Sequence, residues 1–161
     1  MNMSVVLWVG LSDKRTGDNV LPPLSESSPS GKIVDEAIIG LDGYEHIKEN
    51  LVDFAPLDER NRMRYPTSEE MRMGAHRLMG IIERVRPSTV VILGRRAAKA
   101  VFDSFDLSHS CLSFGEFRYR SCSMGGVKYL PVHHPSFISI YRRKHKDSYL
   151  AAVREMIKSP P

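Results

Sequence analysis

The chain has 161 residues, 42% of them hydrophobic, which is enough for one globular domain with a buried core. Its net charge of +4 permits a polyanionic partner without requiring one, because many surface lysines only contact solvent. Cys111 and Cys122 are too few for a disulfide framework and match no zinc or iron–sulfur spacing, so we expect reduced cytosolic thiols. The apolar run at residues 5–10 is too short for a signal segment or a membrane span, and no membrane partner is expected.

The first half of the chain is predicted to alternate between strands and helices. Residues 4–10 are rich in β-branched side chains and typical of a buried parallel strand. Residues 11–31 are polar and interrupted by proline and glycine, which indicates a long loop that is functional or flexible. A helix with Ser30 as its N-cap should follow, and then a short strand over residues 47–54.

The second half begins with the clearest helix, over residues 66–87. Thr67 and Glu70 form a capping box, apolar side chains recur at helical spacing, and Pro87 ends the pattern. After it we predict a buried strand, a helix, a hairpin that turns at Gly125-Gly126 and a terminal helix, over residues 88–94, 95–105, 114–132 and 144–158.

Strands that alternate with helices predict a three-layer α/β/α sandwich around a mostly parallel central sheet, formed as a single domain of residues 1–161. Ligands of such sheets bind at the carboxyl ends of the strands. The loop after Gly10, the strand that carries Asn50 and residues 134–137 are all expected at that edge. The predicted fold therefore indicates one site built from segments far apart in the sequence.

Four segments occur in a recognisable order over nearly the whole chain. They read VGLSDK at residues 9–14, NLVDFAPLDERNRMRYPTSEE at 50–70, RPSTVVILGRRAA at 86–98 and HPS at 134–136. In this order and spacing they resemble the uracil-DNA glycosylase superfamily, most closely its small family-4-like branch. The matching segments of that branch read VGEAPG, NVVKCRPP…RNPTPEE, RPKVIVALGRTAA and HPS. The resemblance implies a DNA glycosylase that flips out uracil or a modified pyrimidine and hydrolyses its glycosidic bond.

The resemblance assigns catalytic roles to the residues that match. His134 would donate a hydrogen bond to the departing base, whereas the alternative is a histidine satisfied inside a turn before proline. Asp13 is the only carboxylate of the first motif, so we expect it to position water and to stabilise positive charge on the sugar. Ser12 is a weaker substitute, and the alternative for Asp13 is a loop turn with Lys14.

The base would be held by Gly10, Leu11, Leu24 and Asn50. The amide of Asn50 suits a pyrimidine edge because it offers a donor and an acceptor together, and the alternative is a structural hydrogen bond. Leu24 stands where relatives carry an aromatic side chain, so it can contact the base without π-stacking, or it is simply a buried leucine.

DNA would be held on both sides of the base. The start of the first helix presents Ser30, Gly31 and Lys32 to a phosphate, unless this is a flexible serine-rich loop. After His134, Ser136 and Phe137 lead an apolar segment to residue 141 that lies where relatives insert a wedge into the duplex. The cations beyond it would hold flanking phosphates or merely face solvent; they are Arg142, Arg143 and Lys144. His133 is expected to pack or to point away.

The chain departs from the family-4 pattern at two iron–sulfur ligand positions, which are Phe54 and Gly74, so we expect no cluster, no metal and no other cofactor. The expected partner is single- or double-stranded DNA, bound by a monomer in the cytoplasm, at the nucleoid or in a host cell if the protein is viral. The altered first motif leaves two other functions open. One is a catalytically inactive protein that binds nucleic acid or nucleotides, and the other is an enzyme of nucleotide or modified-base metabolism.

Overall fold

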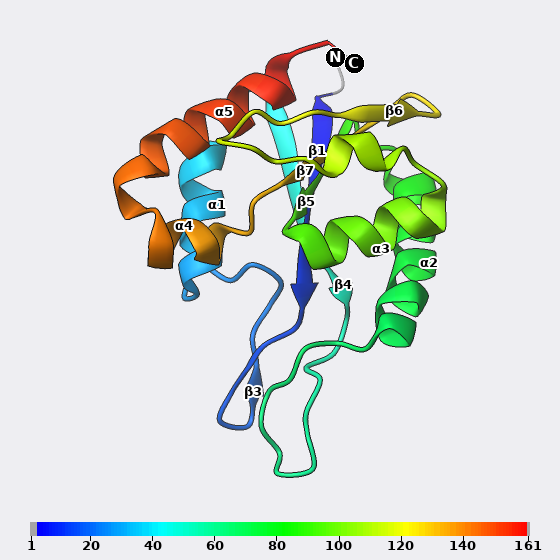
Figure 1. Ribbon diagram of the computed structural model, residues 1–161, viewed down its shortest axis with the longest axis vertical. Helices are drawn as coiled ribbons and strands as arrows, with labels where there is room; N and C mark the ends of the chain where they lie inside the picture. The colour runs from blue at the N-terminus through cyan, green and yellow to red at the C-terminus, as the bar shows by residue number, and fades with distance from the viewer. Residues whose placement is uncertain (1–2, 161) are drawn as a thin grey trace.

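A computed structural model describes residues 3–160, and a five-stranded sheet forms its centre (Figure 1). The order is β4-β1-β5-β7-β6, with β4, β1, β5 and β7 mutually parallel and β6 antiparallel to β7. The mostly parallel sheet is therefore confirmed. The strand bounds are β1 Ser4–Ser12, β4 Tyr44–Val52, β5 Thr89–Leu93, β6 Cys122–Met124 and β7 Val127–Val132.

Helices cover both faces of this sheet and confirm the three-layer sandwich. Alternate residues of a strand point to opposite faces, so Trp8 joins one core, and Leu7 and Val9 join the other. Among residues 3–160, no helix combines the length and apolar character needed to cross a membrane. The first core is covered by α1 (Pro29–Ile39), α4 (Pro135–Tyr141) and α5 (Lys146–Lys158), and the second by α2 (Ser68–Val85) and α3 (Arg95–Phe105) (Figure 1).

The start of α1 differs from the prediction. Its N-cap is Ser28, whose Oγ accepts a hydrogen bond from the Gly31 N–H at 3.0 Å, and not Ser30. Pro29 explains the shift, because a proline suits the first helical position, where its missing N–H is not needed. Ser30 thus lies inside the first turn.

Two other boundaries also move. The strand predicted over residues 47–54 is β4, whose pairing with β1 in register from Ser4↔Tyr44 to Ser12↔Val52 sets both of its ends. The terminal helix starts at Lys146 because the 3-10 turn Arg143–His145 precedes it.

The capping box and the hairpin turn are confirmed. Thr67 Oγ1 accepts from the Glu70 N–H at 3.1 Å, and Glu70 Oε1 accepts from the Thr67 N–H at 2.8 Å. The turn at Gly125-Gly126 joins β6 and β7, although β6 is shorter than the predicted strand. A further 3-10 helix, His109–Leu112, precedes this hairpin.

Two loops extend past the carboxyl ends of the strands (Figure 1). The segment predicted as one loop contains β2 (Arg15–Thr16) and β3 (Asn19–Val20), which pair as a small antiparallel sheet. The second loop connects β4 to α2. Arg15 Nη2 donates to the Asn61 carbonyl at 3.0 Å, so the two loops are tied together below the sheet.

Candidate active site

A cavity of about 830 Å³ opens at the carboxyl edge of the sheet, where the three candidate segments were expected to meet. Strands β1 and β4, the loop before α1, the start of α3 and the start of α4 all contribute to it. The predicted site residues that line it are Gly10, Leu11, Ser12, Leu24, Ser30, Asn50, His134, Ser136 and Phe137. The fold therefore brings the predicted catalytic and base-binding segments together.

Asn50 is held rigidly in one wall of this cavity. Its side chain is buried, and Nδ2 donates to Asp13 Oδ1 at 2.8 Å. Its backbone carbonyl accepts from Arg77 Nη2 of α2. Gly10 is its partner in the parallel pairing of β1 with β4, and a Cβ at Gly10 would lie 2.4 Å from Asn50 Oδ1. The amide is thus oriented by Asp13 and lies against a backbone that has room only for glycine.

Asp13 lies behind this amide rather than in the cavity lining. Its backbone N–H donates to the Val52 carbonyl at 3.2 Å, which holds the residue beside the end of β4. A carboxylate that accepts from Asn50 fixes which end of the amide is the donor. The neighbouring residues Ser12 and Lys14 do line the cavity. In this arrangement Asp13 contacts the Asn50 amide and not the cavity itself.

His134 forms a second wall of the cavity and is the N-cap of α4. Its Nδ1 accepts from the Ser136 N–H at 3.1 Å and lies 2.7 Å from Ser136 Oγ. Because a backbone N–H can only donate, Nδ1 is unprotonated and the proton of the neutral ring is on Nε2. Burial, and then the charge of Lys14, lower the pKa of His134 to about 4. His134 is therefore a neutral imidazole with an Nε2–H to offer at ordinary pH.

The loop before α1 places Leu24 in the cavity in an unusual conformation. Leu24 is buried and has a φ of 49°, a left-handed conformation that leucine rarely adopts. Lys48 Nζ stabilises it by donating to the Leu24 carbonyl at 3.0 Å, and Lys48 also pairs with Asp35 at 2.5 Å. The side chain therefore forms an apolar surface of the cavity that the backbone and Lys48 hold in place.

The predicted phosphate contacts at α1 divide into two kinds. Ser30 lines the cavity, and its buried Oγ has no hydrogen-bond partner among the described residues. Gly31 and Lys32 do not line the cavity: the Gly31 N–H is used by the Ser28 cap, and Lys32 faces solvent. Of the three, only Ser30 is placed to contact a ligand in the cavity.

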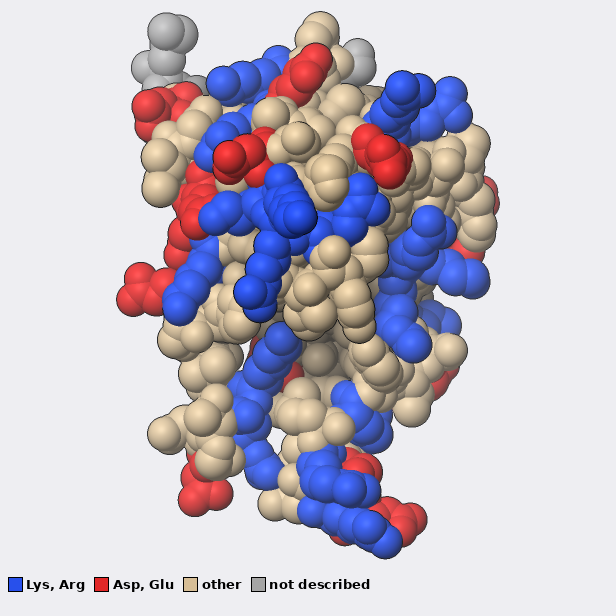
Figure 2. All heavy atoms as spheres, turned by 60° about the vertical axis from the view of Figure 1, so that its left-hand side comes forward, with Lys and Arg blue, Asp and Glu red and all other residues tan. Residues whose placement is uncertain are grey.

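The cations after α4 lie outside the cavity lining. Arg142 is 3.4 Å from Glu116 and 5.8 Å from the Phe117 ring centroid, and Arg143 Nε donates to the Ser139 carbonyl at 2.7 Å. Lys144 is exposed. Figure 2 shows lysine and arginine side chains around the hollowed middle of this face and along the loops below it. The positive surface is therefore broader than the predicted run.

Sequence reasoning missed several residues of the lining. His133 packs as expected, with its ring stacked on Phe137, but it also lines the cavity, and its Nδ1 lies 2.7 Å from the Tyr119 hydroxyl. Arg95 and Arg96 follow β5 directly, so their place after a buried strand ending in glycine was a usable signal. Among the remaining lining residues, the predicted site also left out Lys14, Met63, Arg64, Tyr65 and Phe114.

The residues present do not fit an iron–sulfur cluster. At Gly74, one of the two family ligand positions, a Cβ would lie 2.1 Å from the Leu51 carbonyl oxygen, so no side chain has room there. Across residues 3–160, no group of three or more His, Cys, Asp or Glu side chains lies together as a metal site. Cys111 and Cys122 are free thiols with Sγ atoms 2.6 Å apart, and the cavity lining does not include them.

Two comparisons agree with this geometry. Residues 25–158 match the family model described as the uracil DNA glycosylase superfamily. The chain is also 30% identical, over 148 residues, to the type-4 uracil-DNA glycosylase of Archaeoglobus fulgidus. The aligned region covers 89% of this chain and 71% of that relative. With its sheet order, its cavity at the strand ends and its His-Pro-Ser segment at one wall, the chain belongs to the uracil DNA glycosylase superfamily.

Proposed function

We propose that this protein is a DNA glycosylase that removes uracil or a modified pyrimidine from a flipped nucleotide. The observation that carries the proposal is the neutral, half-buried His134, which shares one cavity with the hydrogen-bonded amide of Asn50. A base inside the helical stack is out of reach, so an enzyme of this kind must receive it in such a cavity. Family membership supports the same reaction class.

The proposed chemistry breaks the bond between C1′ of the sugar and the ring nitrogen of the base. The electron pair leaves with the base, whose ring oxygen then carries negative charge, and the sugar becomes positively charged. The His134 Nε2–H would donate to that oxygen, and Asn50 would bind the pyrimidine edge. Water, and no amine of the protein, would add to C1′, and its proton would pass to solvent.

Asp13 would work as a positioning residue and as a negative charge near the sugar. It holds the Asn50 amide through the 2.8 Å hydrogen bond, so the donor end of that amide is set before a base arrives. Ser12 lines the cavity and can orient the water. A reaction of this kind requires no metal ion and no cofactor.

Two observations favour a second function. Asp13 does not line the cavity and Leu24 replaces a stacking aromatic, so the pocket also suits a protein that binds nucleic acid or nucleotides without catalysis. Action as a monomer stays a prediction. The cytoplasmic location stays a prediction.

The two functions differ in one experiment. Single- and double-stranded oligonucleotides that carry uracil or modified pyrimidines are incubated with the protein, and abasic sites are then revealed by alkaline cleavage. Cleavage at the modified position, lost in His134→Ala, is expected of the glycosylase. Binding without cleavage across the whole panel would contradict it and support the binding protein.

A further inference from the structure

Aromatic side chains are exposed along α4, beside the mouth of the cavity. The Phe137 ring stacks on His133 with centroids 5.2 Å apart and planes 13° from parallel, and Tyr141 follows at 5.8 Å from Phe137. Phe137 is 36% exposed and Tyr141 73% exposed. The row starts in the cavity lining, to which His133 and Phe137 belong, and ends on the open surface.

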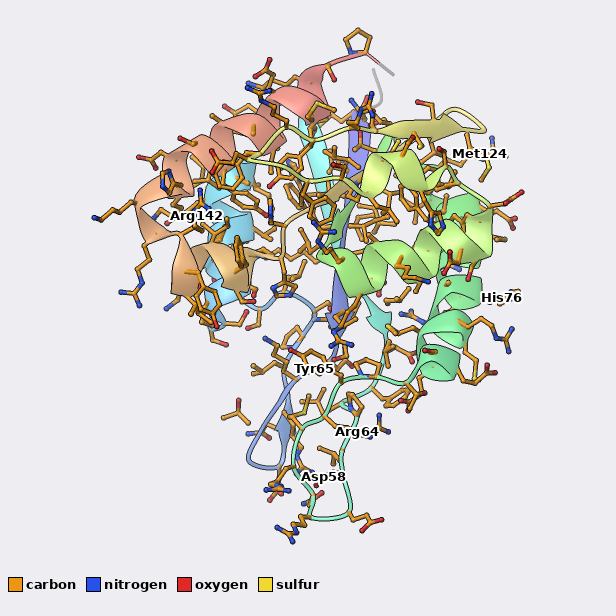
Figure 3. The ribbon with its side chains drawn as sticks, in the orientation of Figure 1. Asp58, Arg64, Tyr65, His76, Met124 and Arg142 are labelled. Atoms are coloured by element: carbon orange, nitrogen blue, oxygen red, sulfur yellow. The ribbon has the colours of Figure 1, made fainter. Side chains whose placement is uncertain are left out.

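A second aromatic position lies on the loop between β4 and α2. Tyr65 is 65% exposed, and the guanidinium carbon of Arg96 sits 4.0 Å from its ring centroid. Both residues line the cavity. Figure 3 places Tyr65 below the strand ends, well separated from Arg142 at the end of α4. The mouth of the cavity therefore carries aromatic surfaces from two different elements.

Unpaired cations surround these surfaces. Lys14, Arg95 and Arg96 line the cavity, and among the described residues none of the three has a carboxylate within ion-pair distance. Arg143 and Lys144, next to Tyr141, are likewise without such a carboxylate in the described chain. Exposed rings among unneutralised cations suit a polyanion that also presents flat apolar faces, which is a nucleic acid strand.

The form of the strand follows from which base faces are free. In a duplex, the bases next to a flipped base remain stacked within the helix, so few of their ring faces are free to contact the protein. In a single strand their faces are free, so stacking on protein aromatics adds binding energy that a duplex cannot gain in the same way. The Phe137 ring also lies flat against His133 in a helix, which suits a platform better than a wedge projecting into a duplex.

We propose that the row His133–Phe137–Tyr141 and the pair Tyr65–Arg96 stack the bases on either side of the target nucleotide in single-stranded DNA. This inference rests on the proposed function and adds to it the strand state of the substrate and the residues that select it.

The test compares Tyr65→Leu, Tyr141→Leu and the double variant with the native protein. Binding of a fluorescent oligonucleotide of ordinary bases is measured by anisotropy, as a single strand and as the matching duplex, over a range of salt concentrations. Each leucine should weaken single-strand binding by about 5- to 100-fold and change duplex binding by much less. The salt dependence should stay the same, because no phosphate contact is removed.

Tyr65→Phe and Tyr141→Phe are the matched controls, since they keep the ring and should bind the single strand like the native protein. Thermal unfolding checks that every variant is folded. Equal weakening for single strand and duplex, no weakening at all, or native protein that prefers the duplex would each overturn the inference.

The two proposals fail in different ways. Excision of the target base that persists while the leucine variants bind single strands normally contradicts the stacking inference alone. Single-strand binding that depends on Tyr65 and Tyr141, with no excision of any base in the panel, contradicts the proposed glycosylase activity alone.

Discussion

The His134 wall and the Asn50 wall of the cavity are built in different ways. On the first wall, His134, Pro135 and Ser136 are consecutive, and the histidine ring is fixed by the helix that begins with them. On the second, Asn50 depends on Gly10 of β1, Asp13 of the loop after β1 and Arg77 of α2. The comparison teaches that a donor can be oriented by neighbours in the sequence, whereas an amide inside a sheet needs partners from other elements.

The largest expected effect concerns the first wall. His134→Ala removes the proposed donor to the departing base and should lower the rate of excision by about 10²- to 10³-fold. The rate is measured in single turnover with a uracil-containing single strand. His109→Ala is the control, because His109 is an exposed histidine paired with Asp103 and away from the cavity lining. A native rate in His134→Ala would remove this residue from the mechanism.

The second wall can be tested by exchanging its two partners. Asn50→Asp alone places two carboxylates side by side and removes the 2.8 Å hydrogen bond between residues 50 and 13. The free energy of unfolding should fall by about 1–3 kcal/mol, and the excision rate should fall as well. The double variant Asp13→Asn, Asn50→Asp can form this hydrogen bond again, but the carboxylate is then at position 50, in the cavity lining. The free energy of unfolding, measured in urea, should then return toward the native value, whereas the excision rate should stay low.

Full recovery of excision in the exchanged pair would show that the position of the Asp13 charge does not matter. Asp42→Asn serves as the control for a lost surface carboxylate, since Asp42 is exposed and does not line the cavity.

Gly10→Ala tests how closely the second wall is packed. The added Cβ would lie 2.4 Å from Asn50 Oδ1, so the amide must move, and the free energy of unfolding should fall by about 1–3 kcal/mol. Chemical denaturation measures this change. Gly80→Ala is the matched control, because a Cβ there meets nothing within 4 Å on an exposed part of α2 and should stabilise by about 0.5–1 kcal/mol. Equal effects of the two changes would contradict the close packing.

The last effect is absent at neutral pH and appears only on acidification, as a pH dependence that comes from the first wall. The pKa of His134 lies at about 4 in the folded protein, below its ordinary value of 6.5, so the unfolded chain binds this proton more readily. Its contribution to stability is present above about pH 6.5 and is lost as the pH falls toward 4. The difference between these two pKa values corresponds to a loss of about 3 kcal/mol by pH 4. His134→Gln should flatten the curve of unfolding free energy over this interval, and an unchanged curve would contradict the shift.

The fold and half of the site could be read from local patterns. The buried strands, the Thr67–Glu70 capping box and the Gly125-Gly126 turn each depend on a few adjacent residues, and all three are confirmed. The N-cap of α1 was placed at Ser30 instead of Ser28 because several serines precede that helix and only the backbone geometry chooses among them. Tyr65 and Phe114 could not be predicted, because nothing nearby in the sequence shows that their loops turn toward the cavity.

The sequence by itself determined the layered α/β/α architecture, since alternating strand and helix patterns leave few other ways to bury two apolar faces. It also determined the His134 wall, where residues two apart cap one another. Only the tertiary structure decided that Asp13 holds Asn50, that Gly74 leaves no room for a cluster ligand and that Tyr65 lines the same cavity as His134. The physical reason is distance along the chain: contacts between residues 37 apart depend on strand register and close packing, which no local pattern encodes.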